Sequence, residues 1–180
     1  MSKARVAVFI DGLNLMFRLR ELGWEEFFDV CNLAERLTRN RELVSVHYYR
    51  PRPSIPPIKT QQQYWDEVAH TTKVEAELQA RHGRLVRYGY MAPRGWGWSE
   101  KQTDVWIAAE MVSLASRDEY DIAVLVTADS DLVPAVEFVR IHGKGVELVV
   151  FPRANPTVTQ LIRSVNSTTT ARRAFFQPYA

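Results

Sequence analysis

Residues 5–14 are RVAVFIDGLN, an apolar run that ends directly in Asp11, Gly12 and Asn14. Apolar residues fill successive positions of this run, so both of its faces are apolar, which is typical of a buried strand in a parallel sheet. A carboxylate at the end of such a strand is costly to bury unless it meets a cation or several hydrogen-bond donors. The stretch therefore predicts a central strand with a functional acid at its carboxyl end.

Working outward, strands and helices alternate along the rest of the chain. Four more apolar runs have the composition of strands, at residues 43–50, 84–90, 122–126 and 146–151. Helical patterns lie at residues 32–39, 59–81, 103–116 and from Leu132 to His142-Gly143. Two segments rich in Pro or Gly are predicted loops, 51–57 and 92–99. This alternation predicts an α/β fold with a parallel sheet covered by helices on both faces, which binds ligands at the carboxyl ends of its strands.

Length and composition indicate one globular domain. The chain has 180 residues, of which 46% are hydrophobic and 24% charged. We expect a domain over residues 1–163, followed by a basic, weakly ordered tail over residues 164–180 that contains Arg172-Arg173 and no acid. No apolar run approaches the roughly 20 residues that span a bilayer, so no membrane association is expected. The lone Cys31 fits a reducing compartment, and with no signal peptide evident we expect a cytoplasmic protein.

The charges are unevenly distributed along the chain. Residues 104–137 contain eight acids and one base, a net charge of −7, whereas the remainder has 22 bases and 13 acids, a net charge of +9. A carboxylate cluster within a basic surface suits a metal-dependent enzyme that acts on a polyanion. Solvated charges that happen to cluster on two helices are the simpler explanation, and charge alone leaves it open.

Three separate segments place acids at one edge of the predicted sheet. Asp129 and Asp131 follow the strand at 122–126, as Asp11 follows the first strand, and Asp104 opens the helix that precedes that later strand. These four carboxylates are expected to converge. Their mutual repulsion is best relieved by a hard divalent cation such as Mg²⁺ or Mn²⁺.

Each of these residues also has a structural alternative. Asp11 with Gly12 is compatible with a simple turn and Asn14 with a helix N-cap, while Asp131 is placed to cap the helix from Leu132. Asp104 is equally compatible with an acid that complements the dipole of its helix. The shared edge favours the metal site, because caps have no reason to select one edge. Glu110, further along the helix of Asp104, is expected to point elsewhere.

Weaker candidates lie just before Asp104. Lys101 is placed to contact a phosphate, although a solvated lysine explains it equally well. Trp96 and Trp98, separated by Gly97 in a basic segment, are placed to stack on unpaired bases. A dimer contact, or folding of the segment back onto the domain, accounts for the two tryptophans as well.

Three motifs resemble a known family. They are FIDGLN at 9–14, KQTDVWIAAEMV at 101–112 and VLVTADSDLVPAVEFVRIHGKGVELV at 124–149. Over about residues 4–163 the chain resembles the NYN domain, most closely the LabA-like branch of the PIN-like nucleases. The resemblance implies a three-layer α/β/α, PIN-like (Rossmann-like) fold with a five-stranded parallel sheet in the order 3-2-1-4-5. It also implies metal-dependent hydrolysis of RNA.

The resemblance assigns roles to individual residues. The acidic metal site of the family corresponds to Asp11, Asp104, Asp129 and Asp131. Asn14 matches an asparagine that orients the first loop, and Thr127 matches a small hydroxyl residue beside the acids. The chain departs from the family where Ala128 replaces a frequent Gly, Gln102-Thr103 replaces Gly-Val, and Glu110 replaces a frequent Asp. None of these changes removes one of the four acids.

We therefore expect a metal-dependent ribonuclease that uses one or two Mg²⁺ or Mn²⁺ ions. The partner is expected to be single-stranded RNA, and a homodimer is expected from the family and the aromatic segment. The residues expected to hold the RNA backbone are Arg50, Arg52, Arg94 and Lys101.

Three other functions are alternatives to the nuclease. A catalytically weak RNA-binding or regulatory module that keeps the acids remains the main alternative. A haloacid-dehalogenase-type phosphatase needs a second Asp where Leu13 stands, and a nucleotide-binding Rossmann enzyme needs a Gly-rich loop that is absent after the first strand.

Overall fold

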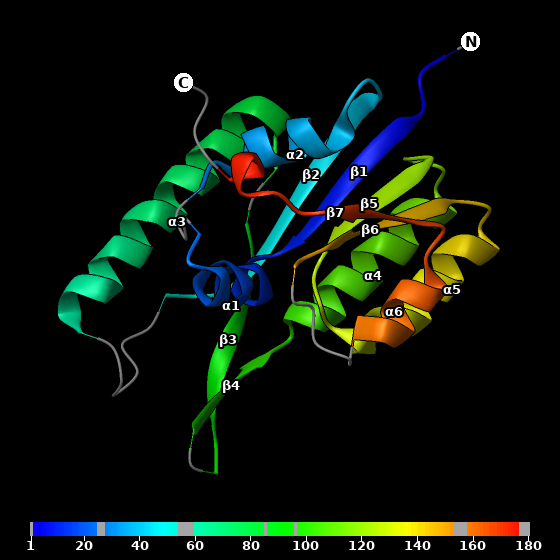
Figure 1. Cartoon of the computed structure of the whole chain (residues 1–180). Helices are drawn as coiled ribbons and strands as arrows, with labels where there is room; N and C mark the ends of the chain where they lie inside the picture. Colours follow the sequence, from blue (N-terminus) through cyan, green and yellow to red (C-terminus); the bar gives the residue numbers. More distant parts are fainter. Residues whose placement is uncertain are drawn as a thin grey trace.

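The computed structural model describes residues 2–24, 28–53, 60–84, 86–95, 97–152 and 158–176. Within these ranges the chain forms a seven-stranded sheet in the order β4-β3-β2-β1-β5-β6-β7 (Figure 1). The strands are β1 (Arg5–Asp11), β2 (Glu42–Pro51), β3 (Arg87–Arg94), β4 (Gly97–Lys101), β5 (Ile122–Val126), β6 (Gly145–Val150) and β7 (Ser167–Thr170). The structure is thus a mixed α/β fold with a mostly parallel sheet.

Strand β1 lies at the centre of the sheet. It pairs in parallel with β2 on one side and with β5 on the other, so that Val8 lies beside both Val46 and Val124. The pairs β2–β3, β5–β6 and β6–β7 are also parallel, and only β3 and β4 are antiparallel. The carboxyl ends of β1 and β5 therefore lie side by side. We call this end of the sheet the carboxyl rim.

Helices cover both faces of the sheet, as Figure 1 shows. They are α1 (Gly12–Leu22), α2 (Val30–Thr38), α3 (Gln61–His82), α4 (Thr103–Ser116), α5 (Val133–Ile141) and α6 (Thr159–Ser164), with short 3₁₀ turns at Ser130–Leu132 (η1) and Arg173–Phe175 (η3). On β1, Val6 and Val8 pack in the core formed with α1, α2 and α3. Ala7 and Phe9 pack in a second core, formed with α4, α5 and α6. Both faces are buried because side chains alternate across a strand, which explains the continuous apolar run.

None of the helices in the described ranges is long and apolar enough to cross a membrane.

The hairpin of β3 and β4 shows that the prediction of a loop over residues 92–99 is wrong. Arg94 pairs with Gly97, so the chain reverses within two residues, and Gly95 adopts a φ of 54° that favours glycine. The glycines in this segment therefore mark a tight turn rather than a loop. The described residues on either side of the turn belong to strands.

The outermost strand beside β6 also differs from the expectation. Within residues 164–176, which were expected to be a weakly ordered tail, β7 pairs with β6 and covers what would be an open edge. Phe176 is buried against Phe28, with 5.5 Å between the ring centroids. The predicted five-stranded order 3-2-1-4-5 does not match the sheet, because β4 and β7 add a strand at each edge.

Candidate functional site

Asp11 lies at the junction between the end of β1 and the start of α1. It is the last residue of the strand and the N-cap of the helix, and its side chain is only 3% exposed. Its Oδ1 accepts a hydrogen bond from the backbone N–H of Asn14 at 3.0 Å, and its Oδ2 accepts one from the hydroxyl of Thr127 at 3.0 Å. The N-cap is therefore Asp11 and not Asn14.

The loop after β5 is tied to this junction by side-chain hydrogen bonds. The Oδ1 of Asn14 accepts from the backbone N–H of Ala128 at 3.0 Å, and Thr127 Oγ1 accepts from the backbone N–H of Asp129 at 3.1 Å. Asp129 in turn caps η1, because its Oδ1 accepts from the backbone N–H of Asp131 at 2.9 Å. Asp131 does not cap the helix that follows it: the N-cap position of α5 is Leu132, without a side-chain cap, and Asp131 is exposed.

Asp104 reaches the carboxyl rim from the first turn of α4. It is half-buried, and burial is the main cause that raises its pKa. The negative charges of Asp129 and Asp131 raise that pKa further, which places the three carboxylates near one another. Complementing the helix dipole does not account for this neighbourhood, because the dipole requires no second acid.

Glu100 is a further acid at the carboxyl rim, and sequence reasoning missed it. It lies on β4, and its carboxylate accepts a hydrogen bond from the Thr103 hydroxyl. Burial raises its pKa to about 7; the charges of Asp104 and Asp129 add to the rise, while Arg50 and the hydrogen bond oppose it. The signal in the sequence is the Gly-rich segment 92–99: as a hairpin turn rather than a loop, it places Glu100 on a strand just before Thr103 and Asp104.

The electrostatics of the carboxyl rim centre on Asp11. Burial raises the pKa of Asp11 to about 7, against the lowering effect of its hydrogen bonds from Asn14 and Thr127. The charges of Glu100 and Asp104 raise that pKa further. Carboxylates that raise one another's pKa values repel one another when they are ionised. A cation bound among them would relieve this repulsion.

The donor set at the carboxyl rim fits a hard divalent cation, because all of its charged groups are carboxylates. Its arrangement is only partly that of a metal site. Among the described residues, no three Asp, Glu, His or Cys side chains are grouped closely enough to hold one ion as they stand. The fold thus gathers the predicted acids at one edge, but it does not preform a ligand shell.

The predicted phosphate-binding arginines on β2 and beyond it have different environments. Arg50 is buried and forms an ion pair with Glu67, at 3.7 Å between Nη2 and Oε2. Neither Nε nor Nη1 of Arg50 has a hydrogen-bond partner within the described part of the chain. Arg52 is exposed and stacks over the ring of Tyr88, with 4.8 Å from its Cζ to the ring centroid. The charge of Arg50 also lowers the pKa of Glu100, so it acts on the carboxyl rim, and a role of Arg50 in holding a phosphate stays a prediction.

The remaining predicted substrate residues lie on the β3–β4 hairpin. Arg94 and Lys101 are exposed, and Trp98 is 41% exposed. The prediction for Trp96 lies outside the described residues.

Glu110 does not join the carboxyl rim, as expected. It accepts hydrogen bonds from Tyr49 Oη at 2.6 Å and Arg87 Nε at 2.8 Å, and lies 3.2 Å from Nδ1 of His47. Burial alone would raise its pKa, but these partners outweigh burial and lower the pKa to about 2. Glu110 therefore serves to attach α4 to the sheet.

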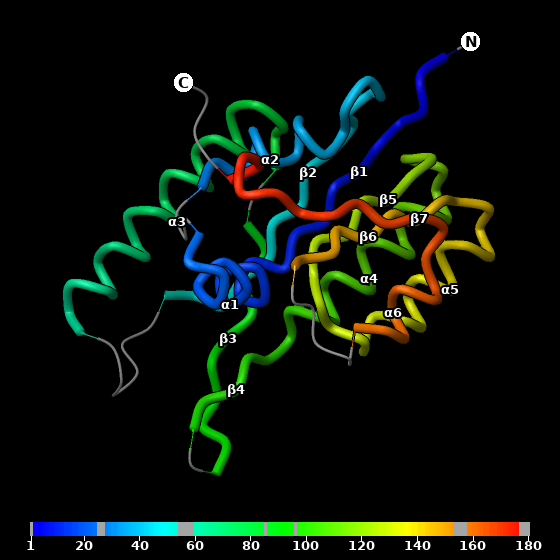
Figure 2. Tube along the Cα trace, viewed as in Figure 1, coloured from blue at the N-terminus to red at the C-terminus, as the bar shows by residue number. Residues whose placement is uncertain are grey.

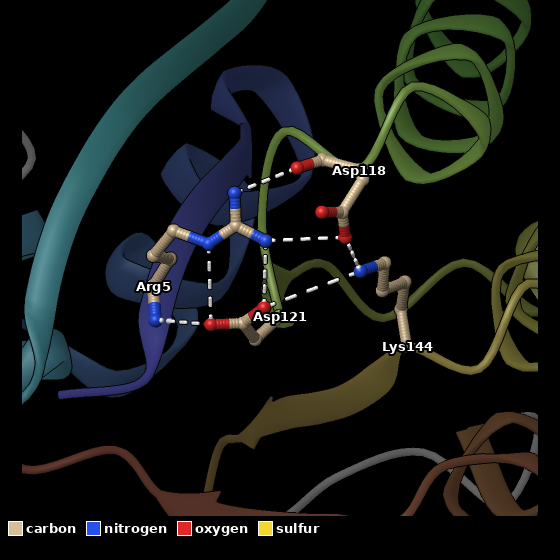
Figure 3. Close-up of polar contacts among 4 residues, drawn as sticks. All are labelled: Arg5, Asp118, Asp121 and Lys144. Atoms are coloured by element: carbon tan, nitrogen blue, oxygen red, sulfur yellow. Dashed lines mark hydrogen bonds and ion pairs between the residues drawn. The ribbon is translucent and has the colours of Figure 1, made fainter. Parts of the chain in front are cut away.

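The acidic stretch at 104–137 contains two groups of aspartates with different environments. Asp118 and Asp121 lie at the opposite edge of the sheet, where Figure 3 shows them with Arg5 and Lys144. Arg5 Nη2 is 2.8 Å from Asp121 Oδ1 and 3.1 Å from Asp118 Oδ1, and Lys144 also pairs with Asp118. These partners lower the pKa values of both acids. The charges at this edge are compensated, in contrast to those at the carboxyl rim.

Comparison with known proteins agrees with this architecture. Among solved structures, a protein of unknown function from Vibrio parahaemolyticus is 22% identical and superimposes with a TM-score of 0.65, over 97% of this chain and 96% of that one. This similarity concerns the fold alone. No curated protein matches the chain. Among protein families, the NYN domain matches residues 5–171. Because the match spans nearly the whole chain, the protein belongs to the NYN domain family of PIN-like nucleases.

Proposed function

We propose that this protein is a metal-dependent ribonuclease that hydrolyses phosphodiester bonds at the carboxyl rim. One observation carries the proposal: Asp11 is a buried carboxylate whose pKa is raised further by the charges of two other carboxylates, Glu100 and Asp104. A purely structural junction has no reason to concentrate like charges at a buried position. Membership of the NYN family supports a nuclease, and we also propose, from its three motifs, that the chain belongs to the LabA-like branch.

The proposed ligands of the metal are Asp11, Asp104, Asp129 and Asp131, with Glu100 as an additional one. When bound, one or two Mg²⁺ or Mn²⁺ ions would supply an activated water and offset charge on the leaving oxygen. Asn14 and Thr127 hold Asp11 and the loop after β5 in place by their hydrogen bonds. Asp129 would ligate through the oxygen that does not cap η1, and the exposed Asp131 would turn inward when the ion binds. Exposed Arg52, Arg94 and Lys101 would hold the RNA backbone.

The experiment is cleavage of single-stranded RNA in Mn²⁺, with and without EDTA, by the wild type and two variants. Asp104→Asn removes one carboxylate of the rim, and we expect it to lower the cleavage rate at least about 100-fold, because metal ligation supplies several kcal/mol. Asp118→Asn is the matched control, an exposed acid at the opposite edge, and should cleave like the wild type. Full activity of Asp104→Asn would contradict the proposed site. DNA of the same sequence shows whether the sugar matters.

A second function has one observation in its favour. Because the described carboxylates do not form a ready group of three ligands, the chain is also compatible with an RNA-binding or regulatory module of weak turnover. Such a module would bind the same RNA in EDTA and in Mn²⁺, and no cleavage product would be sensitive to the chelator. Chelator-sensitive cleavage that depends on Asp104 would exclude it.

A further inference from the structure

The β3–β4 hairpin extends beyond the carboxyl rim, away from the layers of the domain (Figures 1 and 2). Its register determines which side chains share a face. Met91 lies opposite Glu100 and Pro93 lies opposite Trp98. Directly opposed residues of an antiparallel pair point to the same side, as do residues two apart on one strand. Trp98 and Glu100 therefore lie on the same face of the hairpin.

That face is the one directed towards the acids. Glu100 accepts the hydrogen bond from Thr103 at the start of α4, where Asp104 is the next residue. Gly89, on the same face of β3, packs so closely against this helix start that a Cβ there would lie 2.6 Å from Thr103 Oγ1. Trp98 thus follows Glu100 outward from the carboxyl rim along one surface.

The spacing between these two residues suits a nucleic-acid strand. Two residues along a β-strand span about 7 Å, close to the length of one extended nucleotide. A strand whose phosphate lies at the acids would bring a neighbouring base to Trp98. The indole is 41% exposed, and an exposed large aromatic on a projecting hairpin offers a flat surface to an unpaired base.

The charge of the hairpin favours a polyanion as the occupant of this surface. Residues 87–101 contain three cations and one carboxylate, and with Arg87 paired to Glu110 the cations of the hairpin's outer part are Arg94 and Lys101. Arg94 and Lys101 are exposed on the other face of the hairpin, so they can contact phosphates without covering Trp98. The surface is also continuous with the proposed catalytic rim through Glu100.

We propose that Trp98 stacks on an unpaired base next to the scissile phosphate. The inference rests on the proposed function for its ligand. It assigns the β3–β4 hairpin as the arm that selects unpaired over paired strands, because the bases of a duplex are not free to stack on a side chain.

The test is binding of three labelled probes in EDTA, which separates binding from cleavage: a single-stranded RNA octamer, an abasic octamer and a duplex of the same length. Trp98→Ala should bind the single strand roughly 5- to 150-fold more weakly, the loss that corresponds to one stacked base. Its affinity for the abasic strand should be unchanged, and Trp98→Phe should recover most of the loss. The control is Trp65→Ala, which removes an exposed tryptophan from α3 and should have no effect.

Several results would overturn the inference. Equal losses for Trp98→Ala on the base-containing and abasic strands would mean that Trp98 does not contact a base. Failure of Trp98→Phe to recover affinity would contradict stacking, and a change from dimer to monomer in sedimentation would assign the surface to a second copy of the chain. If Mn²⁺-dependent cleavage persists while Trp98→Ala binds normally, this inference fails and the nuclease stands. If binding follows the expected pattern without cleavage, the nuclease fails instead.

Discussion

At the scale of single residues, Asp11 shows that burying a functional carboxylate among other acids costs free energy. Burial and the nearby charges of Glu100 and Asp104 work against ionisation of Asp11, while the hydrogen bonds from Asn14 and Thr127 favour it, and the pKa settles at about 7. An ordinary aspartate has a pKa near 4. The folded protein therefore binds a proton at Asp11 that the unfolded chain has already released at pH 6.

This difference predicts how Asp11→Asn changes stability with pH when no metal is present. Because the pKa of Asp11 is higher in the folded state, the folded protein is destabilised at any pH where Asp11 must ionise. The loss in the free energy of unfolding begins as the pH rises above about 4 and is complete above about 7, reaching up to about 4 kcal/mol. Asp11→Asn removes the charge and keeps an oxygen for the cap. We expect the variant to be more stable than the wild type by about 1–4 kcal/mol at pH 8 and equal to it near pH 4, as measured by urea unfolding in EDTA. A variant less stable than the wild type at pH 8 would contradict the charge repulsion.

At the scale of elements, the contacts between helices and strands hold the carboxyl rim in shape. Gly12 opens α1 immediately after Asp11, and its backbone lies against the buried ring of Tyr48 on β2. A Cβ at this position would lie 2.7 Å from the Tyr48 ring, which is surrounded by core residues and has little room to move. Glycine is therefore required by close packing.

Gly12→Ala is expected to destabilise the protein by about 1–3 kcal/mol, because overpacking of a filled core forces side chains or backbone to shift. Gly97→Ala is the matched control, since a Cβ at Gly97 on β4 meets no atom within 4 Å. Thermal unfolding of both variants measures the difference. Equal midpoints for the two variants would mean that α1 is not held against Tyr48 as described.

Glu110 allows the attachment of α4 to β2 and β3 to be tested in the same way. Its pKa is lowered to about 2 in the folded state, so its stabilising contribution is present above the ordinary glutamate pKa of about 4.5 and is lost as the pH falls towards 2. We expect Glu110→Gln to reduce the free energy of unfolding by about 1–3 kcal/mol at pH 7. The reduction should shrink between pH 4.5 and pH 2. Glu119→Gln, at an exposed acid paired only with Arg117 among the described residues, should change little at either pH. A loss that does not depend on pH would contradict the ionic role of Glu110.

At the scale of the whole molecule, the two ends of the parallel strands differ in how far their acids are paired with cations. Arg5 and Lys144 compensate Asp118 and Asp121 at one edge, whereas carboxylates face carboxylates at the other. The net charge of the chain, +2, conceals this arrangement. Added metal cations should therefore bind at the carboxyl rim and not at the opposite end of the sheet.

This asymmetry predicts a pH-dependent effect of Mn²⁺ on thermal stability. At pH 8, where Asp11 and Glu100 are ionised, saturating Mn²⁺ should raise the melting temperature by about 4–12 °C, the shift expected for roughly 2 to 3 kcal/mol of binding. At pH 5 both groups are protonated, and the shift should nearly vanish. Asp104→Asn should lose the shift at pH 8, and Asp118→Asn should retain it. A shift of equal size at both pH values would place the metal elsewhere.

Much of the architecture was predictable because local rules determine it. The runs at 5–10 and 122–126 are apolar on both faces, and alternation with helices leaves few arrangements other than a covered parallel sheet. The positions of Asp11 and Asp129 at strand ends follow from the same reasoning. The hairpin was not predictable in this way, because the glycines around Trp96 mark a turn and a loop equally well. Neither was β7, whose pairing depends on an edge formed by β6.

The amino-acid sequence by itself determined the α/β class, the central strand and the presence of acids at its carboxyl end, because side-chain period and turn chemistry act over a few residues. Only the tertiary structure decided which acids keep their charge. Burial, neighbouring carboxylates and the reach of Arg5, Lys144 or Arg87 determine this, and all three depend on residues distant in the chain. For that reason Glu100 belongs to the carboxyl rim and Glu110 does not, although both lie within ten residues of Asp104.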